Sequence, residues 1–435
     1  MSPVEVGLLT LFFMLILIWL GFHVGVVLAL LSFLGVWAIK GQFAIANKML
    51  ALATYDAIAS HVFGVIPLFV LMGLLVSEAD IGRDAFSLAH RLLGRFRGGL
   101  GIATVAANTL FAAITGISIA SAAVFTKVAV PEMLRFGYTP RFSVGVVAGS
   151  SVLGMLIPPS LLLIVYGLLS EQSIGALFLA GIVPGLLLAA AFAALILGLA
   201  HFRPELVQRE PAEVTDSEAA AHPVRVLRPI AALVTLVLGG IYGGFFTPME
   251  AGAVGALGAL SIALAKRKLS WQSLWRVLVE TGHVTVAVSF LLIAASLYAR
   301  MLTLSGMPQA LLGALAGTEW GVPAMLIAYL AILIVLGTVL DSTSILLVTV
   351  PLALPLMGGF DVDLVWFGIV TVVAIEIGLL TPPLGLSVYV IHGSLDDERI
   401  ALADVFWGAA PFALVMLVVL VALTLFPMLS LAPLR

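Results

Sequence analysis

Long runs of hydrophobic residues follow one another along almost the whole chain. A helix rising about 1.5 Å per residue crosses about 30 Å of hydrocarbon with roughly 20 such residues. We expect spans at residues 4–20, 23–39, 61–78, 142–168, 174–200, 229–243, 247–265, 281–299, 365–391 and 404–426. The pattern therefore predicts an all-α protein that crosses a membrane many times.

Two further hydrophobic stretches, residues 99–134 and 321–357, are interrupted near the middle by small and polar residues. Each stretch is long enough for two complete crossings. We prefer re-entrant hairpins, because the polar tips would otherwise lie in loops that face lipid. The first tip is Thr115-Gly116-Ile117-Ser118, and the second tip is residues 337–343, with the sequence Gly-Thr-Val-Leu-Asp-Ser-Thr.

The polar segments between these runs are short. Residues 201–228 are rich in Glu, Ala and Pro and are predicted to form a cytoplasmic linker. Residues 83–97 and 269–280 place apolar residues at helical spacing, with basic residues around them. This pattern is typical of a helix lying in the membrane interface. A solvated helix packed on the protein fits it equally well.

Composition and charge favour the same class of protein. Of the 435 residues, 62% are hydrophobic and only 10% are charged, too few for the surface of a soluble domain. With both hairpins in place, sixteen of the 20 Lys and Arg residues lie on one side of the membrane. The positive-inside rule makes that side cytoplasmic, so both termini are expected in the periplasm. The absence of Cys excludes disulfides, thiolate metal sites and Cys nucleophiles.

The chain carries the same pattern of glycines and prolines twice. Ile157-Pro158-Pro159-Ser160 and Thr381-Pro382-Pro383-Leu384 lie 224 residues apart. Other landmarks keep nearly the same offset, namely Gly21-Phe22 with Gly244-Phe245, and Gly82 with Gly306. Each copy contains five complete crossings and one hairpin, and an odd number of crossings inverts the second copy. Inverted repeats with broken helices near the midplane are typical of secondary transporters.

Consecutive prolines inside a span should break the helix, because proline lacks an amide donor and disfavours helical geometry in the preceding residue. The carbonyl groups left unpaired are costly inside a membrane, and a bound cation can accept them. We therefore regard the first break, Gly154–Ser160, and the second break, Gly378–Leu384, as candidate cation sites. A Ser or Thr hydroxyl, or a water molecule, would satisfy the same carbonyls.

Each hairpin tip precedes a new helix. Thr115 or Ser118 at the first tip, and Asp341 or Ser342 at the second, are residue types that commonly cap a helix N-terminus. Two helix N-termini directed at one cavity would bind an anion through their free N–H groups. Asp341 acting as a cap alone is the simpler alternative.

Two glutamates lie in hydrophobic surroundings. Glu250 follows Thr247-Pro248, the pattern of a capping box with proline at the first helical position, so its predicted role is structural. Glu376, two residues before Gly378, has no such pattern. An ionisable group inside a membrane marks a functional site by default. We expect Glu376 to be a cation neighbour or a proton carrier.

Seven stretches spread over nearly the whole chain carry a family resemblance. They are Ile66–Gly73, Gly98–Leu100, Leu156–Ser160, Leu177–Gly185, Thr247–Ala251, Leu340-Asp341 and Gly378–Gly385. In this order they resemble the large membrane subunit of the tripartite ATP-independent periplasmic (TRAP) transporters.

This resemblance implies a subunit of the bacterial inner membrane that imports a small organic acid, usually a carboxylate, in symport with Na⁺. It implies two protein partners, a small four-helix membrane subunit (Q) and a periplasmic substrate-binding protein (P). It also implies elevator-type alternating access and no enzymatic activity. The corresponding domains would be scaffold helices at 1–60 and 229–280 and transport elements at 61–200 and 281–435, with the linker 201–228 between the repeats.

The family's sodium sites lie at each tip and the adjacent break. The first set corresponds here to Thr115, Ser118, Gly154, Ile157 and Pro159. The second set corresponds to Gly337, Asp341, Gly378, Thr381 and Pro383. The substrate is expected at Thr115, Gly116, Ser160, Ser342 and Thr343. The first tip departs from the family's common Ser-Gly-Ser, since Ile117 has no side-chain oxygen, so its site would depend on backbone carbonyls and Ser118.

Three alternatives remain open from the sequence. An autonomous ion-coupled carrier of organic anions from the same superfamily would need no binding protein. An intramembrane aspartyl protease would need two facing carboxylates, and only Asp341 and Glu376 could pair. A channel is disfavoured because two unequal gates indicate alternating access.

Overall fold

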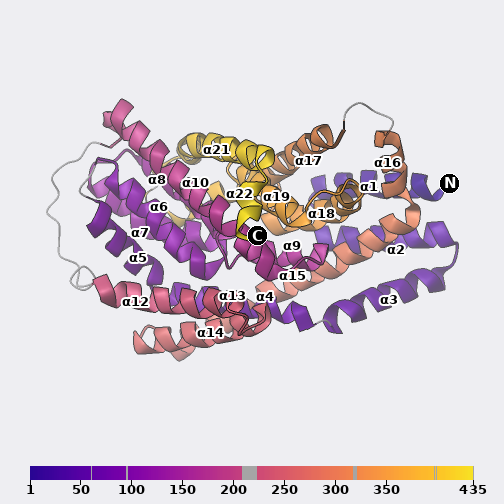
Figure 1. The fold of residues 1–435 in the computed structure, drawn as a ribbon, viewed down its shortest axis with the longest axis horizontal. Coiled ribbons are helices and arrows are strands. Elements are labelled where there is room, and N and C mark those ends of the chain that lie inside the picture. Colours follow the sequence, from indigo (N-terminus) through magenta and orange to yellow (C-terminus); the bar gives the residue numbers. More distant parts are fainter. Residues whose placement is uncertain are drawn as a thin grey trace.

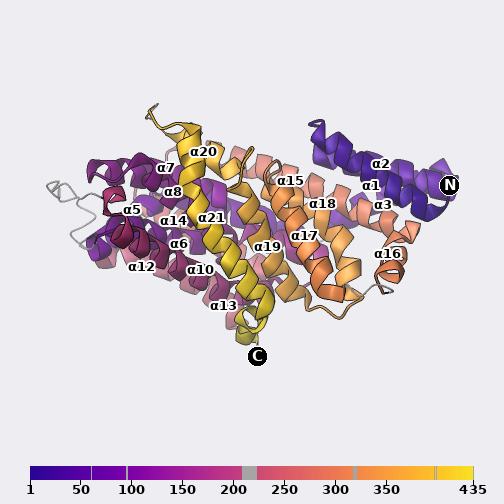
Figure 2. The same ribbon diagram turned by 90° about the horizontal axis from the view of Figure 1, so that it is seen from above.

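The computed structural model describes residues 1–59, 61–94, 97–207, 223–316, 321–395, 397 and 399–434. Over these residues the regular secondary structure is helical, apart from one isolated bridge between Tyr138 and Val207 (Figure 1). Helices α1–α3 gather at one end of the elongated molecule and α5–α8 at the other, with α19 between them (Figures 1 and 2). The predicted all-α class is confirmed.

The first half begins with α1 (Pro3–Trp19), α2 (Val24–Lys40) and α3 (Phe43–Ala59). A short 3₁₀ turn (His61–Gly64) leads to α4 (Val65–Glu78), which bends by 60° into α5 (Ile81–Leu93). The first hairpin is α6 (Gly99–Thr115) and α7 (Ser118–Arg135). The broken helix is α8 (Pro140–Ser151), a 3₁₀ turn (Val152–Met155) and α9 (Leu161–Ser170), followed by α10 (Ile174–Phe202).

The second half repeats this order of elements. It begins with α12 (Pro223–Val234), a π-helical turn (Thr235–Gly239) and α13 (Gly240–Tyr242), followed by α14 (Pro248–Ala265). Then come α15 (Trp271–Ser305) and α16 (Met307–Ala316). The second hairpin is α17 (Gly321–Gly337) and α18 (Ser342–Gly358), and the second broken helix is α19 (Leu364–Leu379) and α20 (Leu386–Ser394). The chain ends with α21 (Leu402–Leu425) and α22 (Met428–Leu431).

The two halves pack into one another. Helix α9 of the first half contacts α18 of the second, and α8 contacts α21. The α8–α21 crossing is close, because a Cβ atom on Gly408 would lie 3.1 Å from the Gly145 Cα. Helix α7 of the first hairpin contacts α20 of the second broken helix, so each hairpin is held against the broken helix of the other half.

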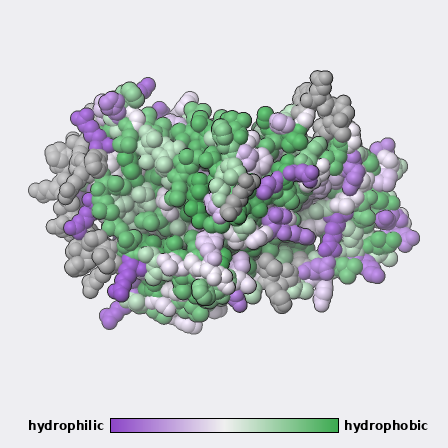
Figure 3. All heavy atoms as spheres, in the orientation of Figure 1, coloured by the Kyte–Doolittle hydropathy of each residue, from purple (hydrophilic) through white to green (hydrophobic). Residues whose placement is uncertain are grey.

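The outer surface is that of a membrane protein. Helices α10, α14, α15 and α21 are each long and apolar enough to cross a bilayer, the bent pair α4–α5 would do so together, and further apolar helices have 10–17 residues. Figure 3 shows hydrophobic residues over most of the middle of one face. Large apolar side chains such as Leu186, Val286 and Val418 are more than half exposed, as expected for groups in contact with lipid.

Three predicted boundaries need correction, and one helix was not predicted. Residues 269–280 do not form a separate helix but contain the first turns of α15. Ser270 is the N-cap of this helix and accepts a hydrogen bond from the Ser273 amide, and the helix then continues without a break to Ser305. Helix α3 was not predicted, since Lys48 and Asp56 interrupt its apolar pattern. The predicted linker is shorter than 201–228, because α10 reaches Phe202 and α12 begins at Pro223, although residues 208–222 lie outside the described part. Of the predicted helix 83–97, residues 95 and 96 also lie outside it, and the helix ends at Leu93.

Candidate functional site

The first tip is pressed against the first break. Gly116 has φ 64°, and a Cβ atom there would collide with the Pro159 carbonyl oxygen. Its own carbonyl oxygen accepts a hydrogen bond from the Leu161 amide at 3.1 Å. A Cβ atom on Gly154 would lie 3.1 Å from the Ile117 carbonyl carbon. Glycine at both positions thus lets two backbones meet without intervening side chains.

The second tip meets the second break in the same way. The Thr338 carbonyl oxygen accepts hydrogen bonds from the amides of Leu384 and Gly385, at 3.0 and 3.2 Å. A Cβ atom on Gly378 would lie 2.6 Å from the Gly337 Cα. The predicted neighbourhood of each tip and its break is therefore present in both halves, with a tip carbonyl as the acceptor each time.

Hydroxyl groups at the tips and breaks donate to nearby carbonyls. Thr115 Oγ1 donates to the Phe111 oxygen at 2.9 Å, and Thr381 Oγ1 donates to the Ile377 oxygen at 2.8 Å. Ser160 Oγ donates to the Met155 oxygen and accepts from the Leu163 amide at 3.2 Å, so that it caps α9. A hydroxyl that donates its proton in this way keeps lone pairs for a cation.

The capping prediction is right at the second tip and wrong at the first. Asp341 is the N-cap of α18, where its Oδ1 accepts from the Ser344 amide at 3.0 Å. The N-cap of α7 is Ile117, with extended backbone and no side-chain bond, so neither Thr115 nor Ser118 caps this helix. Glu250 forms the predicted capping box with Thr247.

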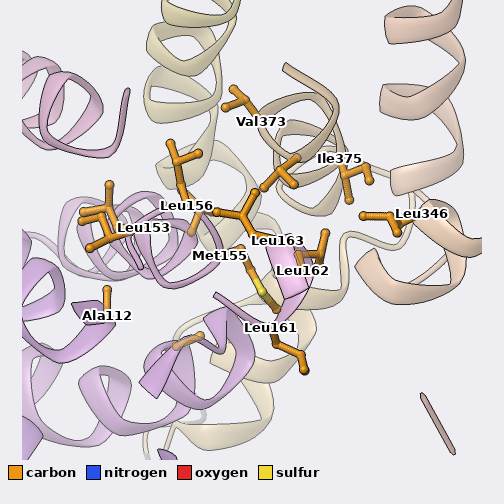
Figure 4. Packing of buried hydrophobic residues seen from close by; sticks show 14 of the residues in the cluster. Ala112, Leu153, Met155, Leu156, Leu161, Leu162, Leu163, Leu346, Val373 and Ile375 are labelled. Atoms are coloured by element: carbon orange, nitrogen blue, oxygen red, sulfur yellow. The ribbon is translucent and has the colours of Figure 1, made fainter. Parts of the chain in front are cut away.

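The two breaks differ in exposure. Every residue from Gly154 to Ser160 is buried, including Ile157 and Pro159, whereas Pro382, Pro383 and Leu384 are exposed. Figure 4 shows why the first break is closed, since Leu162 and Leu163 lie between Leu153 of the first half and Ile375 of the second. The predicted substrate residues Gly116 and Ser160 are consequently buried, and Thr343 is half-buried.

Glu376 brings both tips to one carboxyl group. Its side chain is only 2% exposed, and its Oε1 accepts a hydrogen bond from Ser342 Oγ at 3.0 Å. The hydroxyl of Ser118, at the first tip, faces the same carboxyl group. The Asp341 carboxylate accepts a hydrogen bond from the backbone of its own helix, and the Glu376 carboxylate accepts one from Ser342. These hydrogen bonds do not join the two carboxylates, as an aspartyl protease would need.

Comparisons with known proteins bear on this arrangement. The family model for the DctM component of the tripartite ATP-independent periplasmic transporters matches residues 11–429. The chain belongs to this family. The C4-dicarboxylate TRAP transporter large permease protein DctM of Pseudomonas aeruginosa is 35% identical over 390 residues, covering 88% of this chain and 89% of the relative.

Other relatives are named for different substrates. The 2,3-diketo-L-gulonate TRAP transporter large permease protein YiaN of Escherichia coli is 30% identical, covering 85% of this chain and 86% of that protein. The sialic acid large permease protein SiaM of Vibrio cholerae is also 30% identical, covering 84% of each chain. The crystal structure of the Alcanivorax borkumensis YdaH transporter has the same fold, with a TM-score of 0.58, 14% identity and coverage of 88% and 89%.

Membership of the TRAP family settles the class of protein. The chain is a multi-pass transporter subunit of the inner membrane and not an enzyme. Among the described residues, no group of three or more His, Cys, Asp or Glu side chains could hold a metal ion.

Sequence reasoning missed a buried polar network behind the first tip. Asn108 Nδ2 donates to Ser150 Oγ at 2.6 Å, and Ser121 Oγ donates to Asn108 Oδ1 at 2.5 Å. All three side chains are fully buried and join α6, α7 and α8. Asn108 within an apolar helix was the available signal, because an amide there needs partners for both its ends.

Proposed function

We propose that this TRAP permease imports a small organic acid together with Na⁺, after a periplasmic binding protein has delivered the acid and with a small membrane subunit as partner. The observation that carries the proposal is the paired geometry, in which each tip carbonyl is bonded to the backbone of its adjacent break. Two such oxygen-rich assemblies, one per repeat, suit two coupling cations. The names of the relatives add organic anions as substrates, namely C4-dicarboxylates, sialic acid and 2,3-diketo-L-gulonate.

The unequal exposure of the breaks supports alternating access. A buried first break and an exposed second break are what one end state of a symmetric mechanism would present. In an elevator movement, the hairpins and broken helices would travel together and exchange the roles of the two breaks. Glycines allow the backbones of α8 and α21, and those of Gly337 and Gly378, to approach closely. Such close packing would let these helices move as one body.

Reconstitution tests this function. The chain and its small membrane partner, placed in proteoliposomes with the binding protein outside, should accumulate a labelled C4-dicarboxylate or sialic acid only under an inward Na⁺ gradient. Omission of the binding protein should abolish uptake. Uptake that persists without the binding protein would favour the autonomous carrier, and uptake driven equally by K⁺ would contradict sodium coupling.

A further inference from the structure

Two buried oxygen atoms between the repeats lack hydrogen-bond partners. They are Oε2 of Glu376, on α19 of the second half, and Oγ of Ser118, at the first tip. Ser118 is fully buried and faces the Glu376 carboxyl group without reaching hydrogen-bond geometry. Buried polar atoms in folded proteins are nearly always paired, so these two unpaired oxygens mark a place where a bound ligand would supply the missing contacts.

The other neighbours of the carboxyl group leave its charge uncompensated. Oε1 receives one hydrogen bond from Ser342, and among the described residues no Lys, Arg or His forms an ion pair with Glu376. The hydroxyls of Ser118 and Ser342 face it. An unpaired carboxylate inside a protein is strongly unfavourable, whereas a carboxylate with a bound cation is not.

We propose that Glu376 Oε2, Ser118 Oγ and Ser342 Oγ bind a further monovalent cation, of the Na⁺ class, between the two repeats. Carboxylate and hydroxyl oxygens are the donors that hard cations prefer. The Ser342 hydroxyl donates a hydrogen bond to Glu376, so its lone pairs remain available for the ion. The Ser118 hydroxyl oxygen has no hydrogen-bond partner and is also available.

This site shares Ser118 with the first tip–break set and differs from both tip–break sites in spanning the two repeats and in its charge. Each of those would use oxygens from one repeat, whereas this one takes Ser118 from the first repeat and Ser342 and Glu376 from the second. It also contains a full negative charge in a buried setting. Because its ligands include a residue from each tip, occupancy would favour the conformation that holds both tips together, and Na⁺ binding should be cooperative.

The inference rests on the proposed sodium coupling, and direct ion counting tests it. Na⁺ binding to the purified complex of this chain with its small membrane partner would be measured by ²²Na⁺ scintillation proximity at saturation. We expect Glu376→Gln to bind one Na⁺ fewer per chain than the unsubstituted protein. Its half-saturating Na⁺ concentration for uptake should rise about tenfold or more, since a contact with a charged group is lost.

Matched variants separate this effect from misfolding. Glu280→Gln removes an exposed carboxylate from α15 and should leave the Na⁺ count unchanged. Glu376→Asp retains the charge and should restore the lost ion with weaker affinity. If Glu376→Gln fails to assemble with its partner, Ser342→Ala removes a ligand that neither tip–break set contains and should weaken Na⁺ binding, whereas Ser342→Thr should preserve it.

The outcomes are distinct. An assembled Glu376→Gln complex that binds as many Na⁺ ions as the unsubstituted complex would overturn this inference and leave the proposed sodium coupling intact. The same would follow if Glu376 bound a proton in place of Na⁺, seen as proton uptake with an unchanged Na⁺ count. An unsubstituted complex that binds no Na⁺ would instead overturn the proposed sodium coupling.

Discussion

At the scale of single residues, hydroxyl groups with the same local hydrogen bond can be compared directly. Thr381 Oγ1, at the second break, donates to the Ile377 oxygen at 2.8 Å, and Thr424 Oγ1, within α21, donates to the Leu420 oxygen at the same distance. Both hydroxyls keep lone pairs, but only Thr381 lies at a tip–break assembly. Any difference in Na⁺ dependence between the Ala variants of these two threonines therefore reports on the break and not on the loss of the hydrogen bond within the helix.

We predict that Thr381→Ala raises the Na⁺ concentration for half-maximal uptake by roughly fivefold, because one neutral oxygen ligand is lost. Expression and assembly should be unaffected. Thr424→Ala should keep the unsubstituted Na⁺ dependence, and Thr381→Ser should restore it. Uptake in proteoliposomes over a range of Na⁺ concentrations measures this, and an unchanged curve for Thr381→Ala would place the second cation site elsewhere.

Residue signals predicted part of the site. Asp341 is a predicted cap of α18, and Gly154 and Gly378 are predicted beside the tips, because a capping residue, or a Pro-Pro pair shortly after a glycine, acts locally. The meeting of Ser118 with Glu376 has no local signal, since it depends on how the two halves pack. The N-cap at Ile117 was missed because its side chain forms no capping hydrogen bond, so no local signal marks this position.

At the scale of elements, ion pairs join the α4–α5 bend to the connection between α14 and α15. Lys266 Nζ donates to the Ala79 carbonyl oxygen at 2.7 Å and pairs with Asp84, whose side chain is 22% exposed. Lys268 pairs with Asp80 at 2.8 Å, but their side chains are 51% and 39% exposed. The first lysine thus satisfies a helix-end carbonyl as well as a sheltered carboxylate, and the second does neither.

We predict that Lys266→Met lowers the Tm of the purified complex by roughly 2–4 °C, because a carbonyl and a carboxylate lose a partner. Lys268→Met should leave the Tm unchanged, since solvent and salt already screen that pair. Thermal unfolding in detergent at low and high salt measures both. Equal shifts for the two variants would show that the bend does not depend on the Lys266 contacts.

The elements themselves were largely predictable because their signals are local. Hydrophobic length predicted α1, α2, α10 and α21, and the prolines predicted both broken helices. The second repeat shows where such signals fail. Helix α15 runs for 35 residues without interruption, whereas the first half divides the same length of chain into α3 and α4. Only the packed structure reveals this difference between the repeats.

At the scale of the whole molecule, the inverted orientation of the repeats is the prediction on which the transport proposal depends most. The order of helices recurs, but a helix order alone does not give direction through a membrane. Phe22 and Phe245 occupy equivalent turns after the first helix of each half, and both are exposed, at 57% and 80%. If the second repeat is inverted, these two turns lie on opposite sides of the bilayer.

The absence of Cys from the sequence makes this directly measurable. We predict that Phe22→Cys is modified by a membrane-impermeant maleimide only in inside-out vesicles, because its turn is cytoplasmic by the positive-inside rule. Phe245→Cys should be modified in spheroplasts, from the periplasmic side. The unsubstituted chain is the control and should not react. Modification of both variants from the same side would mean that one hairpin crosses the membrane an odd number of times, and the symmetry that relates the two cation sites would then be lost.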